Sequence, residues 1–175
     1  GQGIIMDRDV AKTVNYALGF GAGIEKLKNV LNCNQITAKR LHKIWWDDKK
    51  PITKLKEILQ SALINRVPMY IKGLDGRKVF VRNKKDVVNT LIQSAGSIVN
   101  KHITVAVNRQ IKEQKLDAHL VLNYHDEINY EIREKELDII KQIIYTSIEE
   151  VNERFKFRVP MDMDIHIGNN WKEIH

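Results

Sequence analysis

The sequence predicts an α+β fold in which a helical first half is followed by a small antiparallel sheet backed by helices. Apolar residues recur at helical spacing through much of residues 7–65 and again over residues 85–115. After each helical region come two short runs of alternating apolar residues, separated by turn residues. The 175 residues suit one compact domain or two small lobes, and 43% apolar with 29% charged residues is an ordinary composition for a folded chain.

Four helices are predicted in the first half. Asp7 is a suitable N-cap for a first helix, which reaches about Leu18 and is ended by the glycine-rich residues 19–23. A short helix follows over residues 24–31. Two further helices are expected over residues 37–48 and 52–65, and Pro51 favours the start of the second.

Two hairpins and two long helices are predicted in the second half. Strands over residues 69–72 and 78–82 are joined by Leu74-Asp75-Gly76, a hairpin signal. A helix over residues 85–115 leads to strands over 118–124 and 128–133, which His125-Asp126-Glu127 connects. A helix over 134–153 and a last strand over 158–167 complete the chain. Alternation predicts two shared strand faces, one of Leu120, Leu122 and Tyr124 and one of Ile128, Tyr130 and Ile132.

The charge balance favours an anionic partner. Lys and Arg number 29 against 22 Asp and Glu, which gives a net charge of +7. Nucleic acid is the simplest such partner, and a solvated basic surface without one fits the charge equally well. The single cysteine excludes a disulfide within the chain and fits a reducing compartment. No apolar run approaches the roughly 18 residues of a membrane span, so we expect no membrane association.

The first predicted helix has a distinctive face. Arg8, Lys12, Tyr16 and Phe20 are spaced by four, and steps of four keep side chains on one broad helix face. Two cations and an aromatic side chain on one face can hold a triphosphate and pack against a sugar or base. A solvated basic face that ends in a glycine cap is the alternative, and spacing alone favours it.

The second predicted hairpin places two acids side by side. Asp126 and Glu127 in a tight turn are well placed to bind Mg²⁺, which prefers carboxylate oxygens and keeps waters that substrate phosphates can replace. The alternative is an ordinary polar turn, since Asp is common in turns.

Taken together and in order, these motifs resemble a known family. Arg8-x3-Lys12-x7-Phe20-Gly21, followed by Tyr124-His125-Asp126-Glu127, resembles the nucleotide-binding helix and the catalytic hairpin of the family A DNA polymerases, with the nearest likeness to the bacteriophage T7-like branch. Three more segments agree: residues 73–78 resemble the stretch before the family's long palm helix, residues 89–96 the start of that helix, and residues 168–175 the family's C-terminus.

The resemblance implies a role for each matching residue. Arg8 and Lys12 would hold the phosphates of the incoming nucleotide, and Tyr16 would pack beside its sugar. Phe20 occupies a position where Tyr is usual, so any hydrogen bond from that hydroxyl is absent here. Asp126 would bind the catalytic Mg²⁺ and Glu127 would support it. The expected DNA contacts are His125 near the primer end, with Arg77, Asn89 and Gln93 in the minor groove.

By the same resemblance, residues 1–66 would form a fingers-like helical region with the nucleotide-binding helix, and residues 67–175 the later, C-terminal half of a polymerase palm. The expected partners are primer-template DNA and a deoxynucleotide, in the cytoplasm of a cell or of a phage host. The family supplies a second essential Asp from a strand before the nucleotide-binding helix, and only seven residues precede Arg8. We therefore expect a fragment or one subunit of a split polymerase, inactive alone, with a second polypeptide or an N-terminal segment supplying the rest of the palm and the thumb.

Two other functions are compatible with the sequence. A non-catalytic duplex-DNA-binding module derived from half a polymerase would account for the absent Asp, but it would have no need of Arg8, Lys12 and Asp126. A single-subunit RNA polymerase shares related motifs, although the Asp126-Glu127 pair and the C-terminal tail look more like those of the DNA enzymes.

Overall fold

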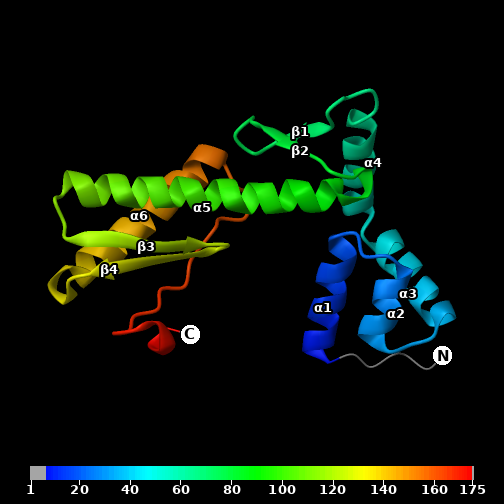
Figure 1. Ribbon diagram of the computed structural model, residues 1–175, viewed down its shortest axis with the longest axis horizontal. Coiled ribbons are helices and arrows are strands. Elements are labelled where there is room, and N and C mark those ends of the chain that lie inside the picture. Colours follow the sequence, from blue (N-terminus) through cyan, green and yellow to red (C-terminus); the bar gives the residue numbers. More distant parts are fainter. Residues whose placement is uncertain (1–6, 175) are drawn as a thin grey trace. The chain divides into compact units, whose positions relative to one another are not determined.

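The computed structural model describes residues 7–174, in two compact units, Gly1–Ser94 and Ala95–His175 (Figure 1). His175, the last residue of the family-like tail, lies outside the described residues. The first unit contains α1 (Arg8–Gly19), α2 (Ile24–Leu31), α3 (Gln35–Asp48), α4 (Lys50–Ala62), β1 (Tyr70–Lys72) and β2 (Lys78–Phe80). A 3₁₀ turn, Lys84–Asp86, leads into α5 (Val87–Glu113), which begins in the first unit and continues into the second.

The first three helices share a small core. Val14, Leu18 and Leu27 are buried in it, and Val10, Val30, Leu31, Leu41 and Trp45 pack around them. The helix ends follow the predicted signals. The Asp7 carboxylate accepts hydrogen bonds from the Asp9 and Val10 backbone N–H groups at 2.8 and 2.9 Å, and Asn34 caps α3 in the same way through the Thr37 N–H.

The β1–β2 hairpin uses one of its faces in a second core. The strands are antiparallel, with Ile71 opposite Val79, Tyr70 opposite Phe80 and Lys72 opposite Lys78. Ile71 is buried and Val79 partly buried, and they pack with residues of α4 and of the start of α5. Because side chains alternate between faces along a strand, Tyr70, Lys72, Lys78 and Phe80 lie on the opposite face.

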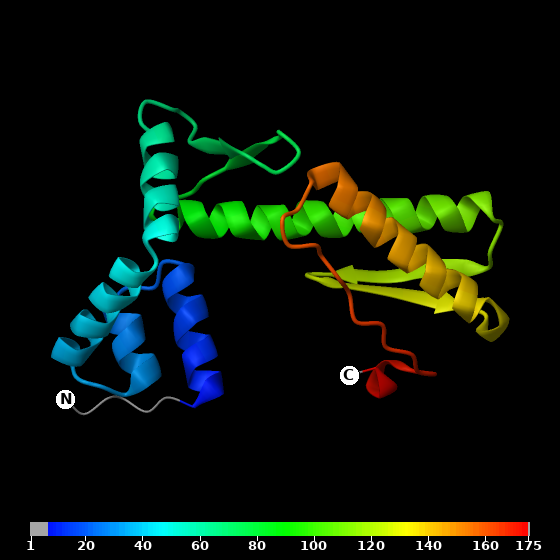
Figure 2. The same ribbon diagram turned by 180° about the vertical axis from the view of Figure 1, so that it is seen from behind.

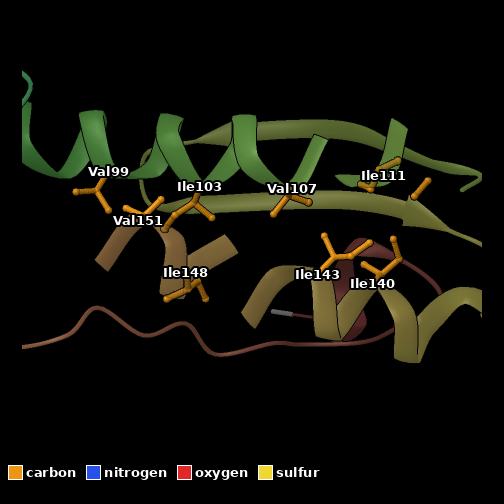
Figure 3. Close-up of a cluster of buried hydrophobic side chains, with 9 residues drawn as sticks. Val99, Ile103, Val107, Ile111, Ile140, Ile143, Ile148 and Val151 are labelled. Atoms are coloured by element: carbon orange, nitrogen blue, oxygen red, sulfur yellow. The ribbon is translucent and has the colours of Figure 1, made fainter. Parts of the chain in front are cut away.

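The second unit is a two-stranded sheet backed by two helices. The sheet consists of β3 (Ala118–Tyr124) and β4 (Glu127–Ile132), and α6 (Leu137–Phe155) follows a 3₁₀ turn at Glu134–Glu136. Seen from behind, α6 crosses α5 diagonally (Figure 2). The buried core lies between α5, α6 and the sheet (Figure 3), and its residues are Val99, Ile103, Val107, Ile111, Ala118, Ile140, Ile143, Ile148 and Val151.

A β-bulge in β3 changes the predicted strand faces. Leu120 pairs with Tyr130, but Leu122 pairs with Asn129, so Val121 is the extra residue. After the bulge, even-numbered residues of β3 lie on the opposite face of the sheet from even-numbered residues before it. The prediction that Leu120, Leu122 and Tyr124 share one face is therefore wrong, because Leu120 lies on the opposite face from the other two. The predicted face of Ile128, Tyr130 and Ile132 is confirmed, since all three pack against the core of the unit.

The strand predicted over residues 158–167 is absent, and no strand occurs after β4 in the part of the chain that the structure describes. Of the alternating apolar side chains there, Met163 packs against the core of the second unit, but Val159 is 81% exposed and Ile167 is 55% exposed. The Asn152 side chain instead bonds both backbone groups of Met161, accepting from its N–H at 2.7 Å and donating to its carbonyl at 2.9 Å. A side chain thus provides the bonds that a neighbouring strand would have made. Within residues 7–174, no helix is both long and apolar enough to cross a membrane.

Replacement of Tyr130 by Phe tests the packing of the sheet on the helices. The Tyr130 hydroxyl is buried without a hydrogen-bond partner among the described residues, and burial raises the pKa of this phenol from 10.0 to about 12. Removing an unpartnered hydroxyl removes a desolvation penalty, so we expect Tyr130→Phe to keep or raise the free energy of unfolding, by up to about 1 kcal/mol. Denaturant titration at neutral pH measures this.

The same variant should remove a pH dependence. Between pH 10 and about 12 the unfolded phenol ionises while the folded one does not, so the wild-type protein loses stability as pH rises through this range. The Phe variant lacks that component. A loss of more than about 1 kcal/mol in Tyr130→Phe at neutral pH would contradict the unpartnered hydroxyl.

Candidate active site

Three of the four residues predicted to bind the nucleotide, Lys12, Tyr16 and Phe20, follow one another along α1. Lys12 Nζ lies 6.0 Å from the centroid of the Tyr16 ring. The rings of Tyr16 and Phe20 are stacked, with centroids 6.1 Å apart and planes 16° apart. Tyr16 is 56% exposed, and the opposite face of the helix buries Val14 and Leu18. Because the opposite side of α1 is packed into the core, Lys12 and the rings of Tyr16 and Phe20 lie in a row on its solvent side.

The cations on this face are not neutralised by neighbours. Arg8 begins α1 one turn before Lys12, and both side chains are exposed. Neither makes an ion pair with any residue in the described range 7–174. An anionic ligand would therefore not have to displace a carboxylate from them.

The end of α1 lies close to the start of α5. Phe20, Gly21 and Asn89 are among the residues that line one narrow crevice in the first unit. Gly21 has a φ of +84°, and a Cβ at this position would lie 3.3 Å from the Lys85 carbonyl oxygen, so glycine suits both the turn and the close approach. The Asn89 side-chain oxygen is buried there without a partner among the described residues. The structure thus brings Phe20 and Asn89 together.

The other two predicted DNA contacts differ in availability. Gln93 lies one turn beyond Asn89 on α5, and its side chain is exposed. Arg77 is already engaged, because its Nε donates to the Asp75 carboxylate at 2.7 Å at the turn of the β1–β2 hairpin. This pairing lowers the pKa of Asp75. A phosphate or base would have to compete with Asp75 for the guanidinium group.

The β3–β4 hairpin is tighter than the sequence indicated. Glu127 is the first residue of β4 and pairs with Tyr124, so the link contains only His125 and Asp126 instead of three residues. His125 has a φ of +55°, the left-handed value that the first position of a two-residue hairpin turn often needs. Its ring lies 4.1 Å from that of Tyr124, centroid to centroid.

The two acids of the hairpin have different surroundings. Asp126 is exposed and makes no hydrogen bond or ion pair with any residue in the described range 7–174. Glu127 is half-buried, and its carboxylate accepts a hydrogen bond from Asn129 Nδ2 at 2.8 Å. Asp126 is therefore the acid available to a ligand, while Glu127 is held on the outer face of the sheet.

A network of polar side chains joins the strand that leads to these acids to two buried residues of α5, Asn100 and Thr104. Asn123 Nδ2 donates to Asn100 Oδ1 and to Thr104 Oγ1, both at 2.8 Å. Thr104 Oγ1 in turn donates to the Asn100 carbonyl at 2.8 Å. These three residues are not among the site residues predicted from the sequence. The signal was present, since Asn100 and Thr104 are polar residues four apart on the buried stripe of a long helix, and Asn123 interrupts an apolar strand.

The surroundings of Asp126 suit a magnesium ion only in part. A free carboxylate in a solvent-accessible turn fits Mg²⁺, which takes one or two carboxylates and completes its shell with waters and phosphate oxygens. Among residues 7–174, no group of three His, Cys, Asp or Glu side chains is close enough to hold a metal ion. Asp126 would therefore be one ligand of a site that other groups complete.

The comparisons with known proteins fit this geometry. The sequence model of DNA polymerase family A matches residues 5–173 of the chain. The chain belongs to DNA polymerase family A. It is similar to the DNA-directed DNA polymerases of Enterobacteria phage T3, at 31% identity, and of Escherichia phage T7, at 30% identity, in both cases over 96% of this chain and 27% of the relative. DNA polymerase I of Treponema pallidum is 25% identical over 96% of this chain and 18% of its own length.

The fold agrees with this membership. The structure is similar to the polymerase domain of Pol1 from M. smegmatis, solved in complex with a DNA primer-template and dNTP, with a TM-score of 0.81 at 20% sequence identity. The similarity covers 95% of this chain and 31% of that one. The predicted α+β class is confirmed. The chain spans 27% of the length of the phage relatives, so it corresponds to one part of the family's polymerase.

Substitutions at Asn100, Thr104 and Asn123 should show how much their hydrogen bonds stabilise the second unit. Asn123→Ala leaves the Asn100 and Thr104 side chains short of a partner in the interior, so we expect the free energy of unfolding to fall by about 1–3 kcal/mol. The combination Asn100→Leu, Thr104→Val and Asn123→Leu removes the polar groups together and should recover most of that loss. Denaturant titration of the wild type, the Asn123→Ala variant and the triple variant measures both effects. A loss below about 0.5 kcal/mol for Asn123→Ala would show that the network contributes little.

Proposed function

We propose that this chain provides the nucleotide-binding helix and the catalytic hairpin of a template-directed DNA polymerase, which adds deoxynucleotides to the 3′ end of a primer. One observation carries the proposal. In a family A chain, the matching cations Arg8 and Lys12 and the matching acid Asp126 are all exposed and make no ion pair with any residue in the described range 7–174. These are the charges that nucleotidyl transfer needs.

The α1 face would bind the incoming nucleotide. The Arg8 guanidinium offers a fork of donors and the Lys12 ammonium a point charge, and both would bind the triphosphate and stabilise the charge that develops on it. Tyr16 and Phe20 would provide the apolar surface for the sugar and base. Support comes from the stacked rings beside Lys12 and from the relatives, which are DNA-directed DNA polymerases.

The β3–β4 turn would hold the reacting end of the primer. Asp126 would bind Mg²⁺, and Glu127, fixed by Asn129, would support that carboxylate from the neighbouring position. Bound Mg²⁺ would supply charge neutralisation on the phosphate oxygens and acidify the attacking hydroxyl. His125 would lie next to the primer end, since it precedes Asp126 in the two-residue turn.

Other parts of the polymerase would come from outside this chain. Two-metal phosphoryl transfer needs at least two carboxylates near the metal ions. The phage relatives are much longer, and this chain spans 27% of each. We propose that a further segment or a second polypeptide contributes the other catalytic Asp and the rest of the palm and thumb. Asn89, Gln93 and Arg77 would contact the primer-template duplex, with Arg77 exchanging Asp75 for DNA.

The first test is primer extension with Mg²⁺ and four deoxynucleotides, using the chain alone and with any polypeptide that co-purifies with it. We expect extension only when the second component is present. Asp126→Asn should then reduce the rate at least about a hundredfold, because removing one charged group at a transition-state site typically costs about that much. Asp164→Asn, at an exposed acid outside the hairpin, serves as the control.

Each of three results would contradict the proposal. Near-normal extension by Asp126→Asn would remove the hairpin from catalysis. Duplex DNA binding with no extension under any condition would identify a non-catalytic DNA-binding module. Preference for ribonucleotides over deoxynucleotides would instead indicate an RNA polymerase.

A second test separates nucleotide binding from chemistry. Arg8→Ala and Lys12→Ala each remove a charged contact to phosphate, worth roughly 1.5–3 kcal/mol, so we expect about a 10- to 100-fold loss in kcat/KM for the nucleotide. The affinity for the primer-template should change little. Lys39→Ala on α3, also an exposed lysine, is the matched control. Nucleotide kinetics that are equal in all four proteins would exclude the proposed role of the α1 face.

A further inference from the structure

The outward face of the β1–β2 hairpin is made of aromatic and cationic side chains. By register, Tyr70 lies opposite Phe80 and Lys72 opposite Lys78. Arg66 joins this face because its guanidinium carbon lies 5.0 Å from the centroid of the Tyr70 ring. We call these five residues the hairpin face.

The exposed aromatic ring has no role in the described packing. Phe80 is 62% exposed, belongs to no hydrophobic core cluster in the described range 7–174, and makes no ring contact there. The Tyr70 ring, in contrast, is already covered by cations, with Lys78 Nζ at 4.9 Å in addition to Arg66. Phe80 therefore offers a flat apolar surface beside fixed positive charges.

The positions of Lys72 and Lys78 destabilise the β1–β2 hairpin. Like charges directly opposite each other in an antiparallel pair repel and destabilise the sheet. The acid nearest in sequence, Asp75, is bound to Arg77 at the turn and does not offset them. An anion between Lys72 and Lys78 would relieve the repulsion. The arrangement thus favours a ligand that has both a negative backbone and flat aromatic groups.

We propose that the hairpin face binds single-stranded nucleic acid, with phosphates at Lys72 and Lys78 and a base stacked on Phe80. Surfaces that bind single strands combine a basic track with aromatic platforms, because every unpaired base has a face that can stack. In a duplex the bases already stack on one another and would not be available to Phe80. The site lies within the first unit, and its binding does not depend on catalysis by the proposed polymerase.

The test is fluorescence anisotropy of a labelled oligothymidylate of about 12 nucleotides, within the site sizes known for such surfaces. The assay omits Mg²⁺ and nucleotide, so failure of the proposed polymerase activity does not affect it. Phe80→Ala should weaken binding about tenfold with an unchanged salt dependence, and Phe80→Tyr should keep wild-type affinity. Ile36→Ala is the control for loss of an exposed apolar side chain, since Ile36 is 81% exposed.

Lys72 and Lys78 should affect the salt dependence of oligonucleotide binding. The double variant Lys72→Ala, Lys78→Ala should reduce the slope of log affinity against log salt by about 1.4, which is two phosphates at roughly 0.7 each. Lys26→Ala, Lys39→Ala is the matched control and should leave the slope unchanged.

Three outcomes would overturn the proposal. One is equal affinity of Phe80→Ala and wild type. Another is equal binding of an abasic oligonucleotide of the same length, since it would show that no base stacks. The third is that polyglutamate of equal charge competes with the oligonucleotide as well as unlabelled oligonucleotide does, and that Phe80→Ala does not change this competition. That result would indicate that the hairpin face binds an acidic protein.

Discussion

The second unit depends on the hydrogen bonds by which Asn123 joins β3 to Asn100 and Thr104 of α5. Asn100 and Thr104 are 7% and 8% exposed, so leaving their polar atoms without a partner is costly, and the Asn123 amide, at the exposed end of β3, provides that partner. The bulge at Val121 makes this compatible with burial of Ala118 earlier in the same strand. Because strand side chains alternate, a shift of one residue would exchange the two faces. The network thereby decides that Tyr124 and Glu127 lie on the outer face beside the Asp126 turn.

Much of this fold could be predicted from local patterns. Helix periodicity, the Asp7 cap and the proline and glycine positions placed α1 to α4 within a few residues, because these signals act within one turn of helix. The bulge could not be predicted. Leu120, Val121 and Leu122 are all apolar and fit either register, and the deciding bonds join residues about twenty positions apart. The predicted last strand failed for a related reason, since its alternation has no partner strand and Asn152 bonds Met161 instead.

The residues of the candidate site could be predicted from motifs. Which of their charged side chains are free to bind a ligand could be judged only from the structure. Arg8, Lys12 and Arg77 are equivalent in a sequence as cations that match a motif. In the structure Arg77 forms an ion pair with Asp75, while Arg8 and Lys12 make no ion pair with any residue in the described range 7–174. Likewise Asp126 and Glu127 are adjacent acids, but Asn129 holds only the second. Neighbours that lie two residues away across a turn or along a strand thus distinguish groups that a motif treats alike.

The outer face of the β3–β4 hairpin also bears on the fate of the chain in a cell. Val121, Leu122 and Tyr124 are 64%, 36% and 60% exposed, which places three apolar side chains in solvent within four residues of an open strand. Exposed apolar strands of this kind promote aggregation between chains, and chaperones and proteases bind to them. A chain with this face in solvent is therefore more prone to aggregation and degradation than one without it.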